Sequence, residues 1–142
     1  MLDPKIREII SECSLNTGAS NEALASVESI IGRTLPHDYV DLLQFSNGFE
    51  GMVGHDGPGS RKDYVCFWPV EMLLEYNEAY KVAEFAPGLF LFGSNGGTTA
   101  YAFDMRENNM SIVAIDFITL CSDELIVVRS NLIKFFRFLT SP

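Results

Sequence analysis

Residues that could take part in chemistry are thinly spread along this sequence, and the glycine-rich segment 94–97, Ser-Asn-Gly-Gly, is the first to consider. A phosphate-binding loop is followed by a helix whose free N–H groups face the anion, and in the nucleotide-triphosphate version by a Lys-Ser/Thr pair. Here Thr98, Thr99 and Tyr101 continue instead with residues typical of a strand. Asn and Gly tolerate the positive φ of a tight turn, so the segment predicts a β-hairpin over residues 89–104.

The inventory of nucleophiles, bases and metal ligands is equally sparse. The serines lack a G-x-S-x-G motif, and the three cysteines, Cys13, Cys66 and Cys121, are too widely spaced for a zinc site or a disulfide framework. We expect them to be small buried residues in a reducing compartment. The two histidines, His37 and His55, are isolated from other ligand types. The sequence therefore predicts no cofactor, no metal and no catalytic residue.

Two single residues offer a choice between a functional and a structural role. Asp104 follows the apolar stretch TAYAF and is the best candidate for a functional acid. The next residues, MRENN, favour a turn that the carboxylate caps by accepting hydrogen bonds from nearby backbone N–H groups. Trp68 could anchor an interface, but a lone Trp at the end of a strand more often fills the core. We predict the structural role for both.

The net charge of −9 limits the classes of partner. Binding to DNA or RNA depends on Lys and Arg that neutralise phosphates, so we expect no direct nucleic-acid partner. The same charge attracts a basic macromolecule, although it also serves solubility alone. Glu71, Glu75 and Glu78 add a local feature, because their i, i+4, i+7 spacing places three carboxylates on one side of a helix.

The length of 142 residues fits one compact domain, residues 1–142, with a core that needs no metal or disulfide. No apolar run is long enough to span a bilayer, and the first residues mix acids with bases where a signal peptide has a basic start and an apolar middle. We expect a cytoplasmic protein that does not bind membranes.

Capping residues and apolar periodicity predict the elements that position these side chains. Helices are expected from Asp3 and Pro4 to about residue 15, and over about residues 20–31, 36–46, 69–80 and 130–139, with Gly32 and Ser130 as caps. Strands are expected over 63–68, 111–118 and 124–129 in addition to the hairpin, and segment 49–60 is expected to be a mobile surface loop. The residues expected to face inward from the helices are Ile6, Ile9, Ile10, Cys13, Leu24, Val27, Ile30, Ile31, Tyr39, Leu42, Leu43, Val70, Leu73, Leu74, Leu132, Ile133, Phe135, Phe136 and Leu139.

Strands that follow one another directly, with helices before, between and after them, are typical of an α+β fold. We therefore predict a mostly antiparallel sheet flanked by helices.

Four segments of the sequence resemble the SMI1/KNR4, or SUKH, superfamily. LPHDYVDLLQFSNGFEG (residues 35–51) is similar to an L-P-x-D-Y segment followed by N-G, and FWPVEMLLEYNEAY (67–80) to a strand-to-helix element with W-P and N-x-x-Y. FGSNGGTTAYAFDM (92–105) resembles the family's hairpin followed by Y-x-F-D, and SNLIKFFRFL (130–139) its closing helix. The four segments occur in the family's order and cover roughly residues 20–140.

The resemblance implies an α+β domain that often serves in bacteria as an immunity protein, which binds and neutralises a cognate toxin of a polymorphic or contact-dependent system. Many such toxins are nucleases or deaminases with basic active sites, which an acidic inhibitor could cover. We therefore expect a non-catalytic protein whose partner is a basic cognate toxin. The residues that we expect to bind it are Glu50, Asp56, Asp63, Glu71, Glu75 and Glu78.

Two other functions stay open, and the oligomeric state is not predicted. Fungal relatives act as regulators, so the chain could be a regulatory adaptor or a ligand-sensing domain with a pocket under the glycine-rich loop. A small hydrolase is the third alternative. It requires Asp104 or His55 to lie in a cleft within hydrogen-bond reach of a second catalytic group.

Overall fold

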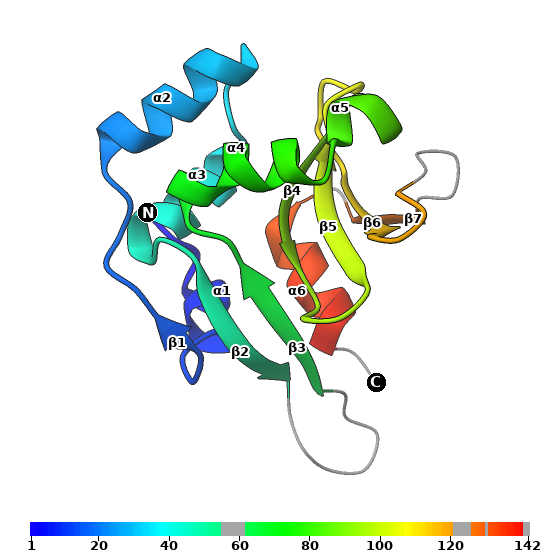
Figure 1. Cartoon of the computed structure of the whole chain (residues 1–142). Coiled ribbons are helices and arrows are strands. Elements are labelled where there is room, and N and C mark those ends of the chain that lie inside the picture. The colour runs from blue at the N-terminus through cyan, green and yellow to red at the C-terminus, as the bar shows by residue number, and fades with distance from the viewer. Residues whose placement is uncertain (55–61, 121–125, 130, 141–142) are drawn as a thin grey trace.

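The computed structural model describes residues 1–54, 62–120, 126–129 and 131–140, and its strands form one antiparallel sheet (Figure 1). Within these residues the sheet has seven strands, and each strand pairs with the next one along the chain, from β1 to β7. The strands are β1 (Ser14–Leu15), β2 (Phe49–Gly54), β3 (Lys62–Phe67), β4 (Leu89–Ser94), β5 (Thr99–Asp104), β6 (Ile112–Asp116) and β7 (Ile126–Arg129). The described helices are α1 (Pro4–Ile9), α2 (Asn21–Ile31), α3 (His37–Phe45), α4 (Val70–Ala79), α5 (Val82–Phe85) and α6 (Leu132–Thr140). The predicted α+β fold is confirmed.

The two faces of the sheet differ in what covers them. Helices α1 and α6 pack on one face, where α6 contacts β2 and β3. Helix α4 packs against β4 from the other side and is followed by α5 (Figure 1). In the part of the chain that the structure describes, no helix lies over β2 and β3 on this second face (Figure 1). We call this uncovered part, β2 and β3 with the adjoining end of β4, the open face.

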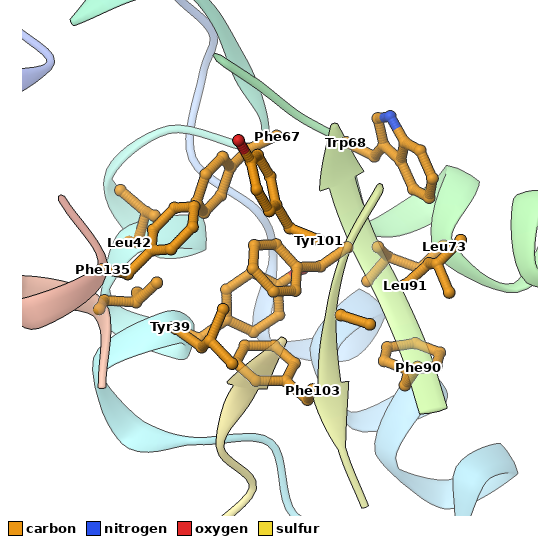
Figure 2. Packing of buried hydrophobic residues seen from close by; sticks show 14 of the residues in the cluster. Tyr39, Leu42, Phe67, Trp68, Leu73, Phe90, Leu91, Tyr101, Phe103 and Phe135 are labelled. Carbon is orange, nitrogen blue, oxygen red and sulfur yellow. The ribbon is translucent and has the colours of Figure 1, made fainter. Parts of the chain in front are cut away.

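Aromatic rings fill the space between the sheet and helices α3 and α6. Phe67 stacks on Phe136 with 5.7 Å between ring centroids, and Phe92 stacks on Phe103 at 4.5 Å. Tyr39 of α3 lies edge-on to Phe103 at 4.9 Å. Figure 2 shows these rings gathered on one side of the sheet, while Trp68, Leu73 and Leu91 lie toward α4. Burial of this much apolar surface is the main force that holds the helices on the sheet.

Local sequence signals set the ends of several helices, as predicted. Asp3 accepts a hydrogen bond from the N–H of Lys5 at 2.8 Å, and Ser20 accepts one from Ala23 at 3.1 Å. Gly32 ends α2 in the left-handed conformation, with φ of 73°. The hairpin is also confirmed, since β4 and β5 pair and Gly96 in their turn has φ of 81°.

The prediction of a loop over residues 49–60 is wrong for its first half, because residues 49–54 form β2. The side chains of Phe49 and Val53 are buried in the core. Pairing with β3 along the strand, and with β1 at Phe49 and Glu50, provides partners for its backbone N–H and C=O groups. Position 51 of the strand requires glycine, because an added Cβ would lie only 3.0 Å from the Cα of Cys13. Residues 55–60 lie outside the described residues.

Other predicted details differ at the first and second helices. Helix α1 ends at Ile9, so Cys13 is buried beyond the helix and the following residues form β1, which we did not predict. Ile30 was expected in the core but is 65% exposed. It lies beyond the edge of the buried stripe of Leu24 and Val27, about 60° around the helix from Val27 and about 120° from Leu24. Ser130 lies outside the described residues.

A residue from another helix helps to cap α6. Asn131 accepts from the N–H of Lys134 at 3.0 Å, and Asp38 of α3 accepts from the N–H of Leu132, also at 3.0 Å. The described helices include none that is long and apolar enough to cross a lipid bilayer.

Candidate functional site

The acidic row of α4 is exposed along its whole length. Glu71, Glu75 and Glu78 are all exposed, whereas Val70 and Leu73 on the opposite side of the helix are buried. The spacing i, i+4, i+7 keeps the three carboxylates within one stripe of the helix surface. The row is therefore free to approach a partner without a change in the fold of α4.

Two asparagine side chains fix the position of α4. Asn47 precedes β2, and its carbonyl oxygen accepts from the N–H of Val70 at 2.8 Å while its amide donates to Glu71 at 2.6 Å. Asn77 lies near the other end of α4, accepts from the N–H of Leu91 at 2.9 Å and donates to the carbonyl of Leu91 at 3.0 Å. Because one end of the helix is bonded to the segment before β2 and the other to β4, the acidic row has a fixed direction.

The remaining acids of the expected binding surface do not all lie together. The register pairs Glu50 with Cys66 and Val53 with Asp63. Residues paired across antiparallel strands point to the same face of a sheet, and Val53 is buried on the face covered by α1 and α6. Glu50 therefore lies on the open face and Asp63 on the opposite one. Asp56 lies outside the described residues.

The open face carries a surface depression of about 580 Å³ beside the glycine-rich turn. The residues that line it are Glu50, Tyr64, Cys66, Ser94, Asn95, Gly96 and Gly97. The Tyr64 hydroxyl donates a hydrogen bond to the Glu50 carboxylate, and this bond is the largest of the causes that raise the pKa of Tyr64 to about 12. Burial, followed by the charge of Glu50, raises the pKa of the Cys66 thiol, so the thiol stays protonated and unreactive at neutral pH.

Trp68 is buried, as predicted, and belongs to an aromatic cluster that joins α4 to the end of β6. It is 7% exposed and lies edge-on to Tyr76 of α4 at 4.8 Å. Phe117, which follows β6, contacts Trp68 at 6.4 Å and Tyr80 at 4.8 Å. Tyr76 and Tyr80 are spaced i, i+4 and form a helix stripe separate from the acidic one. The cluster thus supports α4 along the side that the glutamates leave free.

Asp104 has the structural role that the sequence favoured. Its carboxylate accepts from the backbone N–H of Arg106 at 3.1 Å and from the guanidinium of the same residue through two bonds of 2.9 Å. The bond from the Arg106 guanidinium is the largest cause that lowers the pKa of Asp104. A carboxylate held in this way is a weak proton acceptor, and its partner is a cation rather than a second catalytic group. His55, the other candidate, lies outside the described residues.

The described residues contain no group of three or more His, Cys, Asp or Glu side chains placed to hold a metal ion. Tyr64 and the Ser94–Gly97 turn were missed as lining residues because their position depends on strand register. The alternation of Tyr64 and Cys66 with the buried Val65 and Phe67 was the available signal.

A family model describes most of this chain. The model of the SMI1 / KNR4 family (SUKH-1) matches residues 18–137. The chain belongs to the SMI1/KNR4 family. No curated protein matches it at a significant level.

The structure explains the residues by which the sequence resembles the SMI1/KNR4 family. Asp38 caps α6, Asn47 and Asn77 hold α4, and Asp104 fixes the turn after β5. Gly48 has φ of 78° and lies so close to the start of α4 that an added Cβ would be 2.7 Å from the Pro69 nitrogen. These residues stabilise the SMI1/KNR4 fold, so membership of the family predicts the scaffold more directly than the partner.

Proposed function

We propose that this SMI1/KNR4 domain is a non-catalytic binding protein, and most concretely an immunity protein that neutralises a cognate toxin of a polymorphic or contact-dependent system. The family resemblance supports this function, because bacterial members of the superfamily often have it. The net charge of −9 supports a basic partner such as a nuclease or deaminase toxin.

The exposed acidic row of α4 is the observation that carries the proposal. Glu71, Glu75 and Glu78 share one helix stripe, and bonds to Asn47, just before β2, and from Asn77 to β4 hold that helix in place. Exposed charges of one sign on a fixed element give a partner of opposite charge a defined direction of approach. A toxin that binds nucleic acid is expected to be basic around its active site, so an acidic surface would compete with the substrate there.

The first experiment uses the gene neighbourhood and a growth assay. A neighbouring gene for a large secreted protein with a C-terminal toxin domain provides the candidate partner. We expect co-expression of this chain to restore growth of cells that express that toxin domain, and the two proteins to co-purify. Failure both to bind and to protect would contradict the proposal.

Charge reversal then tests the binding surface. In the Glu71→Lys/Glu75→Lys variant we expect the association rate constant to fall by about tenfold or more at low salt, with little change in the free energy of unfolding. The matched control is Glu22→Lys/Glu107→Lys, which changes the net charge equally at exposed positions on α2 and on the turn after β5. An equal loss in both variants, measured by surface plasmon resonance, would mean that only the overall charge matters.

A further inference from the structure

The depression beside the glycine-rich turn has walls of different chemistry. Cys66 of β3 and Ser94 of β4 are paired in the register and form its floor, and Glu50 is paired with Cys66 on the next strand. The ring of Tyr64 and the turn at Asn95, Gly96 and Gly97, which lie against each other, complete its lining. Small side chains beside an aromatic ring and a carboxylate leave room for one long side chain.

Gly96 lets the Tyr64 ring lie against the turn. A Cβ added at Gly96 would be 2.6 Å from Cδ1 of Tyr64, so any other residue would push the ring away. The turn is also bonded internally, because Ser94 accepts from the Gly96 N–H at 3.1 Å and Asn95 accepts from the Gly97 N–H at 2.9 Å. The ring therefore has a fixed support before any ligand binds, which lowers the entropy cost of binding.

Glu50 supplies the charge of the depression. It is exposed, and among the described residues its carboxylate bonds only to the Tyr64 hydroxyl, with no Lys or Arg in an ion pair with it. A carboxylate has about four lone-pair positions, so most of its capacity to accept hydrogen bonds is available to a ligand. An anion would be repelled, and a neutral ligand would leave the charge unpaired.

We propose that this depression is a binding site for one arginine side chain of the partner, with the guanidinium hydrogen-bonded to Glu50 and stacked on the ring of Tyr64. The site deepens the proposed function and depends on it for the identity of the partner, because a basic toxin offers arginine at its surface. A planar guanidinium can stack on an aromatic ring and form two parallel bonds to a carboxylate, whereas an ammonium group does neither. The arginine would lie on the open face, and the acidic row of α4 would guide the partner toward it.

The test uses two small probes, N-acetyl-arginine amide and N-acetyl-lysine amide, which carry the same charge. Each is titrated into the isotopically labelled full chain, and backbone amide shifts are followed by NMR. We expect the arginine probe to give saturable shifts at Gly96, Gly97 and Cys66, and the lysine probe to bind about tenfold more weakly. Equal shifts with both probes, or no saturable shift with arginine, would overturn the site.

Variants assign the binding to named groups. Glu50→Gln keeps the size of the side chain and is expected to weaken the arginine probe by about tenfold, and Tyr64→Leu by several-fold. Glu22→Gln is the control, since it removes an exposed carboxylate on α2, away from the depression and the acidic row, and should leave the probe affinity unchanged. Because Glu50 is exposed, Glu50→Gln is expected to keep the far-ultraviolet spectrum and unfolding midpoint of the original chain.

The same variants separate this site from the proposed function. If the chain protects against its toxin but Glu50→Gln leaves the dissociation rate of the complex unchanged, the arginine site is wrong and the immunity function stands. If arginine binds selectively but no neighbouring toxin is bound or neutralised, the site stands and the immunity function is wrong.

Discussion

Gly48 and Gly32 have nearly the same backbone φ, 78° and 73°, in different surroundings. A Cβ at Gly48 would be 2.7 Å from the Pro69 nitrogen and 2.8 Å from the Phe67 oxygen, whereas a Cβ at Gly32 would meet nothing within 4 Å. We expect Gly32→Ala to lower the free energy of unfolding by about 1 kcal/mol, which is the cost of positive φ alone. Gly48→Ala should cost about 3 kcal/mol or more, because backbone atoms must also move.

Urea denaturation of the two variants measures this difference. Equal losses would mean that the approach of Gly48 to the start of α4 does not constrain the residue. The comparison isolates the surroundings, since the backbone φ of the two residues is matched.

Asp104 makes part of the stability depend on pH. Its pKa is lowered in the folded state, chiefly by the hydrogen bond from Arg106, so the bond contributes its full stability above the pKa of the unfolded chain. That contribution is lost as the pH falls through the folded pKa. We expect Asp104→Asn to cost about 1 kcal/mol at neutral pH, a small value because the Arg106 side chain is 47% exposed.

The pH dependence of unfolding checks the assignment. The difference in unfolding free energy between the original chain and Asp104→Asn should shrink as the pH falls below about 4, the ordinary pKa of an aspartate, and approach zero once the pH is below the lowered folded pKa. A difference that is constant with pH would mean that the carboxylate acts by shape alone.

At the scale of elements, the side chain of Asn77 holds α4 against β4, because it bonds the backbone of β4 in the way that a neighbouring strand would. Asn77 bonds both the N–H and the carbonyl of Leu91, which is fully buried. Because Leu91 is fully buried, loss of Asn77 leaves these two groups without that side-chain partner. We expect Asn77→Ala to lower the free energy of unfolding by about 2–3 kcal/mol. Glu78→Ala, one residue further along the same helix and exposed, should change it by less than about 0.5 kcal/mol.

Amide hydrogen exchange provides a second reading of this prediction. In Asn77→Ala the N–H of Leu91 should exchange faster than in the original chain, relative to the neighbouring amides of β4. Unchanged protection of the Leu91 N–H would contradict the role of Asn77. It would mean that apolar contacts alone hold α4 on the sheet.

At the scale of the whole molecule, the described buried residues form one core that reaches from α1 to α6. Ile10 is fully buried in it, although it lies outside the residues that the family model matches. We expect the chain to unfold in one transition, so that the fluorescence of its one tryptophan, Trp68, and the far-ultraviolet circular dichroism change together. Ile10→Ala should lower both midpoints equally and cost about 3 kcal/mol.

The control for this prediction is Ile30→Ala. Ile30 is 65% exposed, so its loss should cost less than about 0.5 kcal/mol. Two separate transitions, or a shift in only one signal for Ile10→Ala, would show that the N-terminal segment folds apart from the sheet.

Sequence alone determined the parts of this protein that depend on neighbours along the chain. Asp3 and Ser20 cap their helices through bonds to residues two or three positions away, and Gly32 ends α2 by its own backbone freedom. The hairpin turn is equally local. Because such signals act within a few residues, the helices, the central hairpin and the α+β class could be predicted, and the family resemblance added the order of the elements.

Only the tertiary structure decided which side chains share a surface. Glu50 and Asp63 lie on opposite faces because side chains alternate along a strand and the register of β2 with β3 pairs Val53 with Asp63. Strand β2 itself was missed, since its glycines suggest a loop until pairing supplies their hydrogen bonds. The exposure of Ile30, the caps that Asp38 and Asn47 provide to distant helices, and the depression beside Gly96 likewise arise from contacts between segments far apart in the chain.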